Sequence, residues 1–151
     1  MPLMSSSGAM TPYVIHEYNS SYDDDLRRIY LESRQQTFHW LDTSAYQLND
    51  FDQATQDEAI RVALVEEKPV GFISWYEPDY FIHNLFINQA YTKQGIGKAL
   101  LNCCLAEIGR PARLKCLQQN LNALKFYQSQ GWRIEAEGDS EDGPYYLMWL
   151  D

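Results

Sequence analysis

Basic residues are scarce in this chain: twelve Lys and Arg stand against twenty-one Asp and Glu, a formal net charge of −9. Nucleic acid and anionic membranes are disfavoured as partners, because neutralising phosphates takes a clustered basic surface. Long apolar runs are also missing, and none approaches the length needed to span a bilayer. We therefore expect no nucleic-acid partner and no membrane association. A negative field of this kind favours a cationic partner such as an amine.

Cysteines are few as well: Cys103, Cys104 and Cys116. An odd count that includes an adjacent pair fits a reducing compartment better than a disulfide framework, so we expect a cytoplasmic protein. Neighbouring side chains on a helix point about 100° apart, and no His is close to this pair in the sequence, so we expect no metal site. The three cysteines are interpreted as core-filling residues.

The length of 151 residues and the hydrophobic fraction of 45% are those of one globular domain. The sequence contains no internal repeat and no linker. Residues 1–10 are small and polar and lack the charged and apolar regions of a signal peptide. They are interpreted as a disordered leader or a cloning remnant, which leaves the domain at 11–151.

Hydrophobic periodicity and turn residues predict seven strands and four helices in the order β-α-α-β-β-β-α-β-α-β-β. An acidic run opens the first helix, and glycines follow the last two. This order predicts a single α/β domain, with a mixed sheet and helices on its faces. The expected strands are 13–18, 60–66, 70–76, 80–87, 113–117, 133–137 and 145–150, and the expected helices are 23–37, 46–51, 98–108 and 121–130.

A glycine-rich loop, Gln94-Gly95-Ile96-Gly97-Lys98-Ala99, lies between an expected strand and an expected helix. Such a loop brings the backbone close to a ligand, and the helix start presents free N–H groups to an anion such as pyrophosphate. It is not a P-loop, because Thr92 and Ala99 stand where that motif needs Gly and Ser or Thr. It is not a dinucleotide fingerprint either, because Leu100 replaces the third Gly. By itself the loop fits either a ligand site or a tight turn.

A second motif follows: Asn120, Ala123, Phe126-Tyr127 and Gly131-Trp132, in the pattern Asn-x-x-Ala-x-x-Phe-Tyr-x-x-x-Gly-aromatic. Together with Leu85-Phe86-Ile87 and the glycine loop, it resembles the GNAT acetyltransferases in motif, order and spacing. The resemblance is strong over residues 70–132 and looser elsewhere. It implies a mostly antiparallel sheet and an N-acetyltransferase that uses acetyl-CoA as co-substrate.

The resemblance also implies which residues bind acetyl-CoA. The strand bearing Leu85, Phe86 and Ile87 would leave main-chain groups free for the pantetheine arm, and Asn120 would touch the same arm. Amides of the loop would surround the pyrophosphate: Lys93, Gln94, Gly95, Ile96, Gly97, Lys98 and Ala99. The family has Gln or Arg three residues before the first Gly, where this chain has Thr92, which puts one side-chain contact in doubt and leaves the backbone cradle intact.

Two catalytic residues are implied in the same way. Tyr127 matches the tyrosine that donates a proton to the leaving thiolate of CoA, and a phenol that is neutral at working pH suits this step. His83, two residues before Leu85, resembles a base used in the arylalkylamine branch, and an imidazole accepts a proton at neutral pH. Glu77 is the alternative base. Both His83 and Tyr127 also fit a purely structural role.

The acceptor is expected to be a primary amine, most simply a small molecule, because the chain carries no evident docking module. Segments 34–55 and 138–146 combine aromatic and carboxylate side chains, which suits a cationic or aromatic amine and fits a solvated rim equally well. A catalytically silent acyl-CoA-binding module is the competing function. The Tyr- and Trp-rich closing strand at 145–150 is interpreted as a surface that could form a homodimer.

Overall fold

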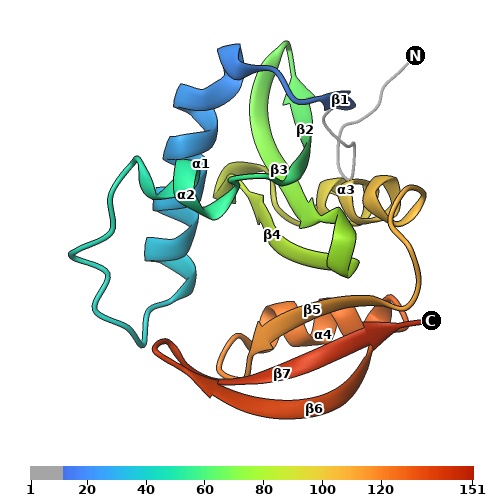
Figure 1. The fold of residues 1–151 in the computed structure, drawn as a ribbon. Coiled ribbons are helices and arrows are strands. Elements are labelled where there is room, and N and C mark those ends of the chain that lie inside the picture. The colour runs from blue at the N-terminus through green and yellow to red at the C-terminus, as the bar shows by residue number, and fades with distance from the viewer. Residues whose placement is uncertain (1–11) are drawn as a thin grey trace.

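The computed structural model describes residues 12–151, in which seven strands form one sheet in the order β1-β2-β3-β4-β5-β7-β6 (Figure 1). All neighbouring strands are antiparallel except β4 and β5, which confirms the predicted single α/β domain with a mixed, mostly antiparallel sheet. The strands are β1 Val14–Glu17, β2 Ala59–Val65, β3 Lys68–Tyr76, β4 Phe81–Ile87, β5 Ala112–Leu117, β6 Arg133–Ser140 and β7 Gly143–Leu150. The helices are α1 Asp23–Thr37, α2 Asp50–Ala54, α3 Ile96–Leu105 and α4 Leu121–Ser129.

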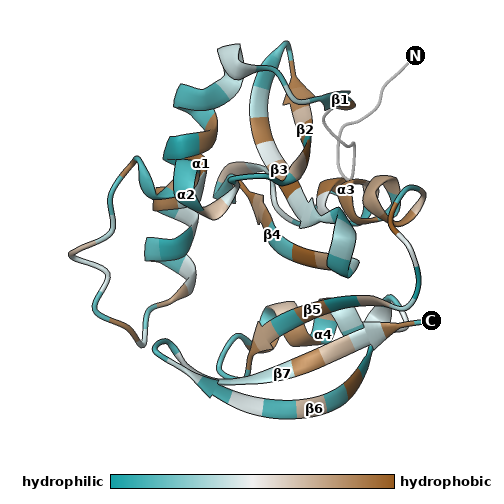
Figure 2. Ribbon diagram, in the orientation of Figure 1, coloured by the Kyte–Doolittle hydropathy of each residue, from teal (hydrophilic) through white to brown (hydrophobic). Residues whose placement is uncertain are grey.

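Two hydrophobic cores lie on opposite faces of the sheet. The larger one packs α3 and α4 against the strands and includes Trp75, Leu100 and Leu114. The smaller one packs α1 and α2 against β2 and β3 and includes Leu26 and Phe72. Hydrophobic residues concentrate along β2, β3 and α3, whereas most of α1 and β6 is hydrophilic (Figure 2). None of the helices in the described part of the chain is long and apolar enough to cross a membrane.

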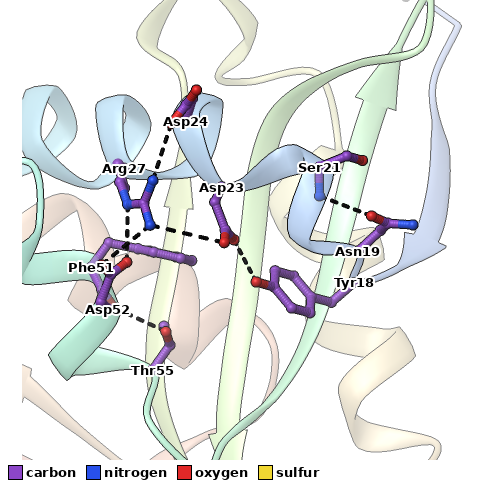
Figure 3. A network of polar contacts seen from close by, with 9 residues as sticks. All are labelled: Tyr18, Asn19, Ser21, Asp23, Asp24, Arg27, Phe51, Asp52 and Thr55. Carbon is purple, nitrogen blue, oxygen red and sulfur yellow. Dashed lines mark hydrogen bonds and ion pairs between the residues drawn. The ribbon is translucent and has the colours of Figure 1, made fainter.

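A polar network fastens α1 to α2 (Figure 3). The Arg27 guanidinium donates to Asp24 on its own helix at 3.0 Å and to Asp52 on α2 at 3.0 Å. At the start of α1, Tyr18 donates to Asp23, and burial together with this carboxylate raises the pKa of Tyr18 to about 12. The acidic run therefore begins α1 and also accepts hydrogen bonds from Tyr18 and Arg27. Through Arg27, the short helix α2 has a defined place beside the sheet.

Three predictions need correction. The helix expected at 46–51 lies at Asp50–Ala54, because Phe51 turns into the smaller core and Asp52 binds Arg27. The helix expected from Lys98 begins at Ile96. The strands expected at 133–137 and 145–150 are longer and leave a shorter turn between them, since β6 and β7 pair as far as Ser140 and Gly143.

The dimer interpretation also changes. The closing strand, β7, lies inside the sheet between β5 and β6, so its edges are already paired and cannot join a second copy. The strand at that edge of the sheet is β6, nearly all of whose residues are exposed. The leader interpreted at residues 1–10 lies outside the described residues.

Candidate active site

Strands β4 and β5 separate soon after they meet. They pair only at Phe81–Arg113 and Ile82–Leu114, and no register joins the rest of β4 to β5. On the other edge of β4 the Asn88 amide donates to the Val70 carbonyl at 2.7 Å. Because an antiparallel ladder uses alternate residues, the backbone groups of Leu85 and Ile87 point away from β3, toward the opening. The Ile87 carbonyl accepts from Ser33 Oγ at 3.3 Å. The backbone amides of Leu85 and Ile87 and the Leu85 carbonyl are left for a ligand.

The glycine loop ends in a helix start with free amides. Gly95 has φ 84°, a left-handed conformation that suits glycine, and it precedes the first turn of α3 without a side-chain cap. Among the described residues, the amides of Ile96, Gly97 and Lys98 have no backbone partner. The Ala99 amide donates to the Gly95 carbonyl at 3.0 Å, so it belongs to the helix and is not free for a ligand. Three adjacent N–H groups at a helix N-terminus form an anion site.

Gln94 and Lys93 complete this loop. Lys93 adopts φ 62°, and the Oε1 atom of Gln94 is buried without a hydrogen-bond partner among the described residues. The loop thus contains a buried polar group that no described residue satisfies. Thr92, at the position where the resembled family has Gln or Arg, donates its hydroxyl to the Gln89 carbonyl at 3.0 Å. Its side chain stabilises the turn before the loop.

The two sequence motifs meet in space. A Cβ atom added at Gly97 would lie 3.9 Å from Cζ of Phe126, so the start of α3 touches α4 beside Tyr127. Tyr127 packs against Trp132 with ring centroids 5.9 Å apart and joins the larger core. Burial raises the pKa of the Tyr127 phenol above its ordinary value, and the thiols of Cys116 and Cys104 act in the same direction. The phenol therefore stays protonated and neutral at neutral pH.

Asn120 precedes α4 and caps it. Its Oδ1 accepts from the Ala123 amide at 3.3 Å, and no hydrogen bond within the described residues uses its Nδ2. The carbonyl half of this side chain thus has a structural task, while the amide half is free to donate to a ligand.

His83 lies where β4 bulges. Ser74 pairs with Asn84, but the next residue of β3, Trp75, pairs with Ile82, so His83 is the extra residue of a β-bulge. The bulge puts His83 beside Asn84 on the α1–α2 face, whereas Leu85 and Ile87 pack toward the α3 core. A cavity of about 410 Å³ opens there, lined by Tyr30, Gln53, Ala54, Gln56, Glu58, His83 and Asn84.

Glu58 is a site residue that the sequence did not indicate. Its side chain is only 6% exposed, and it forms a hydrogen bond with Nδ1 of His83. Glu58 is 25 residues from His83 in the sequence, and nothing in its local pattern points to the site. The alternative base, Glu77, accepts from the indole N–H of the buried Trp75 at 3.0 Å and does not line the cavity.

The two segments expected to recognise the acceptor meet near this cavity. The Trp40 indole N–H donates to the Asp142 carbonyl at 3.5 Å, which joins the loop after α1 to the β6–β7 turn. The buried guanidinium of Arg34 lies 3.8 Å from the ring centroid of Tyr30 and 4.3 Å from that of Tyr46. It also donates to Asp50 at 3.2 Å. The cation that these two tyrosine rings and the Asp50 carboxylate bind is therefore the side chain of Arg34 itself.

A family model described as the acetyltransferase (GNAT) family matches residues 20–132, which include the opening between β4 and β5, the glycine loop and α4. The chain belongs to the GNAT acetyltransferase family. No match was found among curated proteins. Groups of three or more His, Cys, Asp or Glu that could hold a metal ion do not occur within residues 12–151.

Solved structures share the GNAT fold at low sequence identity. PaiA N-acetyltransferase from Thermoplasma acidophilum, in complex with coenzyme A, has a TM-score of 0.74 and 18% identity, over 91% of this chain and 98% of that one. Apo YjaB from Escherichia coli has a TM-score of 0.73 and 20% identity, over 91% and 97%. YncA from Salmonella typhimurium, a putative acetyltransferase with its cofactor acetyl-CoA, has a TM-score of 0.72 and 16% identity, over 91% and 92%.

Proposed function

We propose that this GNAT acetyltransferase transfers acetyl from acetyl-CoA to a primary amine directly, in a ternary complex. The observation that carries the proposal is the contact between the start of α3, with its free amides, and α4 next to Tyr127. The anion site and the neutral phenol thereby belong to two helices in contact, which suits a ligand that carries a pyrophosphate at one end and a thioester at the other. Two of the similar structures contain coenzyme A or acetyl-CoA, which supports the same choice of co-substrate.

Acetyl-CoA supplies an acetyl group activated as a thioester. The free amides of Ile96, Gly97 and Lys98 would hold its pyrophosphate, with Lys93, Gln94, Gly95 and Ala99 shaping the loop around it. The unpaired backbone groups of Leu85 and Ile87, which flank Phe86, and the free Nδ2 of Asn120 would bond the pantetheine arm. A main-chain N–H near Leu85 would polarise the acetyl carbonyl, because it is fixed in place before the reaction.

Two protons move through the side chains. His83 takes one proton from the ammonium form of the acceptor, so that the nitrogen lone pair can form the C–N bond. As the C–S bond breaks, Tyr127 gives its proton to the departing sulfur and recovers one from the acylated nitrogen. His83 then releases its proton to solvent. One proton thus ends on the CoA thiol and one in solvent, which balances the conversion of an ammonium ion and a thioester into an amide and a thiol.

The acceptor is expected to be a small, cationic amine. The net charge of −9 favours an approaching cation, and the cavity beside His83 has the volume of a small-molecule site. The three cysteines of the chain are all free, in keeping with a reducing compartment, and we place the protein in the cytoplasm.

Calorimetry and thiol release test the proposal. We expect acetyl-CoA to bind with a Kd in the micromolar range, and the control ligands dephospho-acetyl-CoA and NAD to bind more weakly. Phenethylamine or lysine should then support the release of free CoA thiol. Tyr127→Phe should keep acetyl-CoA binding while losing most of the turnover. Binding without turnover for any amine would favour the silent acyl-CoA-binding module, and no binding by the folded protein would overturn the assignment of the loop.

A further inference from the structure

The cavity beside His83 contains a chain of polar contacts that runs into the sheet. Nδ1 of His83 forms a hydrogen bond with Oε2 of Glu58, and Oε1 of Glu58 accepts from the Ser74 hydroxyl at 2.7 Å. The Ser74 hydroxyl in turn accepts from Nδ2 of Asn84 at 2.8 Å. Ser74 is fully buried and Asn84 is 7% exposed, so the end of this chain of polar contacts that lies inside the sheet is rigid.

Asn84 also joins this chain to α2. Its Nδ2 donates to the Ala54 carbonyl at 3.2 Å, at the C-terminal end of the helix that Arg27 fastens to α1. The backbone amide of Glu58 donates to the Thr55 carbonyl at 3.1 Å, which fixes where β2 begins. Glu58 is therefore held through both its backbone and its carboxylate.

The bonds of Glu58 restrict the imidazole. A carboxylate with 6% exposure is costly unless each oxygen has a donor, and here each oxygen has one. A neutral His83 bound to Glu58 through Nδ1 must carry its proton there, which leaves Nε2 as the acceptor. Within residues 12–151, Nε2 makes no hydrogen bond, and the His83 side chain is 44% exposed at the cavity.

We propose that Glu58 is a positioning residue that fixes the tautomer and direction of the His83 ring, with Ser74 and Asn84 as its anchor. This inference rests on the proposed function, because His83 needs Glu58 in this way only if its Nε2 accepts a proton from an amine. The arrangement follows a general rule for catalytic bases, in which a third group orients the base toward its substrate. The competing explanation is an ion pair that merely ties the start of β2 to β4.

The first test is independent of activity. Nitrogen NMR of ¹⁵N-histidine-labelled full-length protein distinguishes the two ring nitrogens, and His83→Gln assigns the signal among the three histidines. At a pH where the ring is neutral, we expect the proton of His83 on Nδ1, and a shift toward Nε2 protonation in Glu58→Gln. A wild-type ring protonated on Nε2 would overturn the proposal. Ser74→Ala keeps the Glu58 carboxylate but removes one of its hydrogen bonds, so it should broaden or partly shift the same His83 signal. This variant replaces Glu58→Gln if Glu58→Gln folds poorly.

The second test separates positioning from structure. With acetyl-CoA and phenethylamine, Glu58→Gln should lower kcat roughly tenfold or more while leaving the Kd of acetyl-CoA unchanged. In a His83→Gln background the same change should cost less than about twofold, because a residue that acts only through His83 has nothing left to position. Equal losses in both backgrounds would overturn the proposal and leave the transferase function standing.

Glu107→Gln is the matched control. It removes a carboxylate that accepts from Arg61 at 2.7 Å outside this cavity, and it should change neither the NMR signal nor kcat. If the wild-type protein binds acetyl-CoA but acetylates none of a panel of amines that includes phenethylamine and lysine, the proposed function fails on its own. The tautomer measurement then still decides whether Glu58 orients His83.

Discussion

Arg34 is a buried cation whose loss should weaken the packing of α1 against the segment that joins it to α2. It lies near the end of α1, is 8% exposed, and lies between Tyr30 and Tyr46 while it donates to Asp50. A hydrogen bond to a charged group contributes about 1.5–3 kcal/mol. A cation–π contact contributes about 0.5–2 kcal/mol, with the higher values for desolvated pairs.

Arg34→Ala removes these contacts together. Because one side chain makes all of them, their separate contributions to the free energy of unfolding do not simply add. Asp50 is 34% exposed and can be hydrated once its partner is gone, which limits the additional cost. We expect the free energy of unfolding to fall by about 3 kcal/mol. For a chain of this length that corresponds to a decrease in Tm of about 10 °C.

Thermal unfolding followed by circular dichroism measures this effect. Arg28→Ala is the matched control on the same helix, because Arg28 is 58% exposed and, within residues 12–151, pairs only with Asp25, at 3.4 Å. Its loss should cost less than about 1 kcal/mol. If the loop after α1 contributes to the proposed acceptor site, Arg34→Ala should also raise the KM of the amine more than the Kd of acetyl-CoA. Free energies of unfolding within about 1 kcal/mol of each other for the two arginine variants would contradict a stabilising role for Arg34.

Two further predictions concern α4 and alkaline pH. Asn120→Ala removes the cap of α4 and should cost about 1 kcal/mol in urea unfolding, whereas Asn120→Asp keeps the acceptor for Ala123 and should cost less; equal losses would contradict the cap. If Nδ2 touches the pantetheine arm, Asn120→Asp should also weaken acetyl-CoA binding in calorimetry. Burial raises the pKa of Cys116 from 9.0 to about 11 and also raises the pKa of Tyr127. The folded state therefore keeps protons that the unfolded state loses, and stability present below about pH 9 falls as the pH rises toward about 11. Tm measured across this range should decrease, less steeply in Tyr127→Phe, and a flat profile would contradict the burial of these groups.

The sequence by itself determined the order of the elements and the place of the cofactor motifs. The Asp run marked the start of α1, and Gly95 and Gly131 stand next to α3 and α4 with φ angles of 84° and 93°. These signals work because capping, glycine conformations and hydrophobic periodicity depend on residues a few positions apart. The family pattern over residues 85–132 rests on the same kind of local information.

Contacts between distant segments were beyond such signals. The position of α2 depends on Arg27 and on the burial of Phe51, and β6 and β7 lengthen because each strand supplies hydrogen bonds to the other. The edge position of β6 follows from strand order, which no local pattern encodes.

The link between Glu58 and His83 is the clearest case. One extra residue in β4 shifts its register against β3 and puts His83 on the same face as Asn84, next to the start of β2. A single-residue change of register exchanges the two faces of a strand, so alternation read from the sequence cannot locate a bulge. The tertiary structure alone decided which carboxylate meets this histidine.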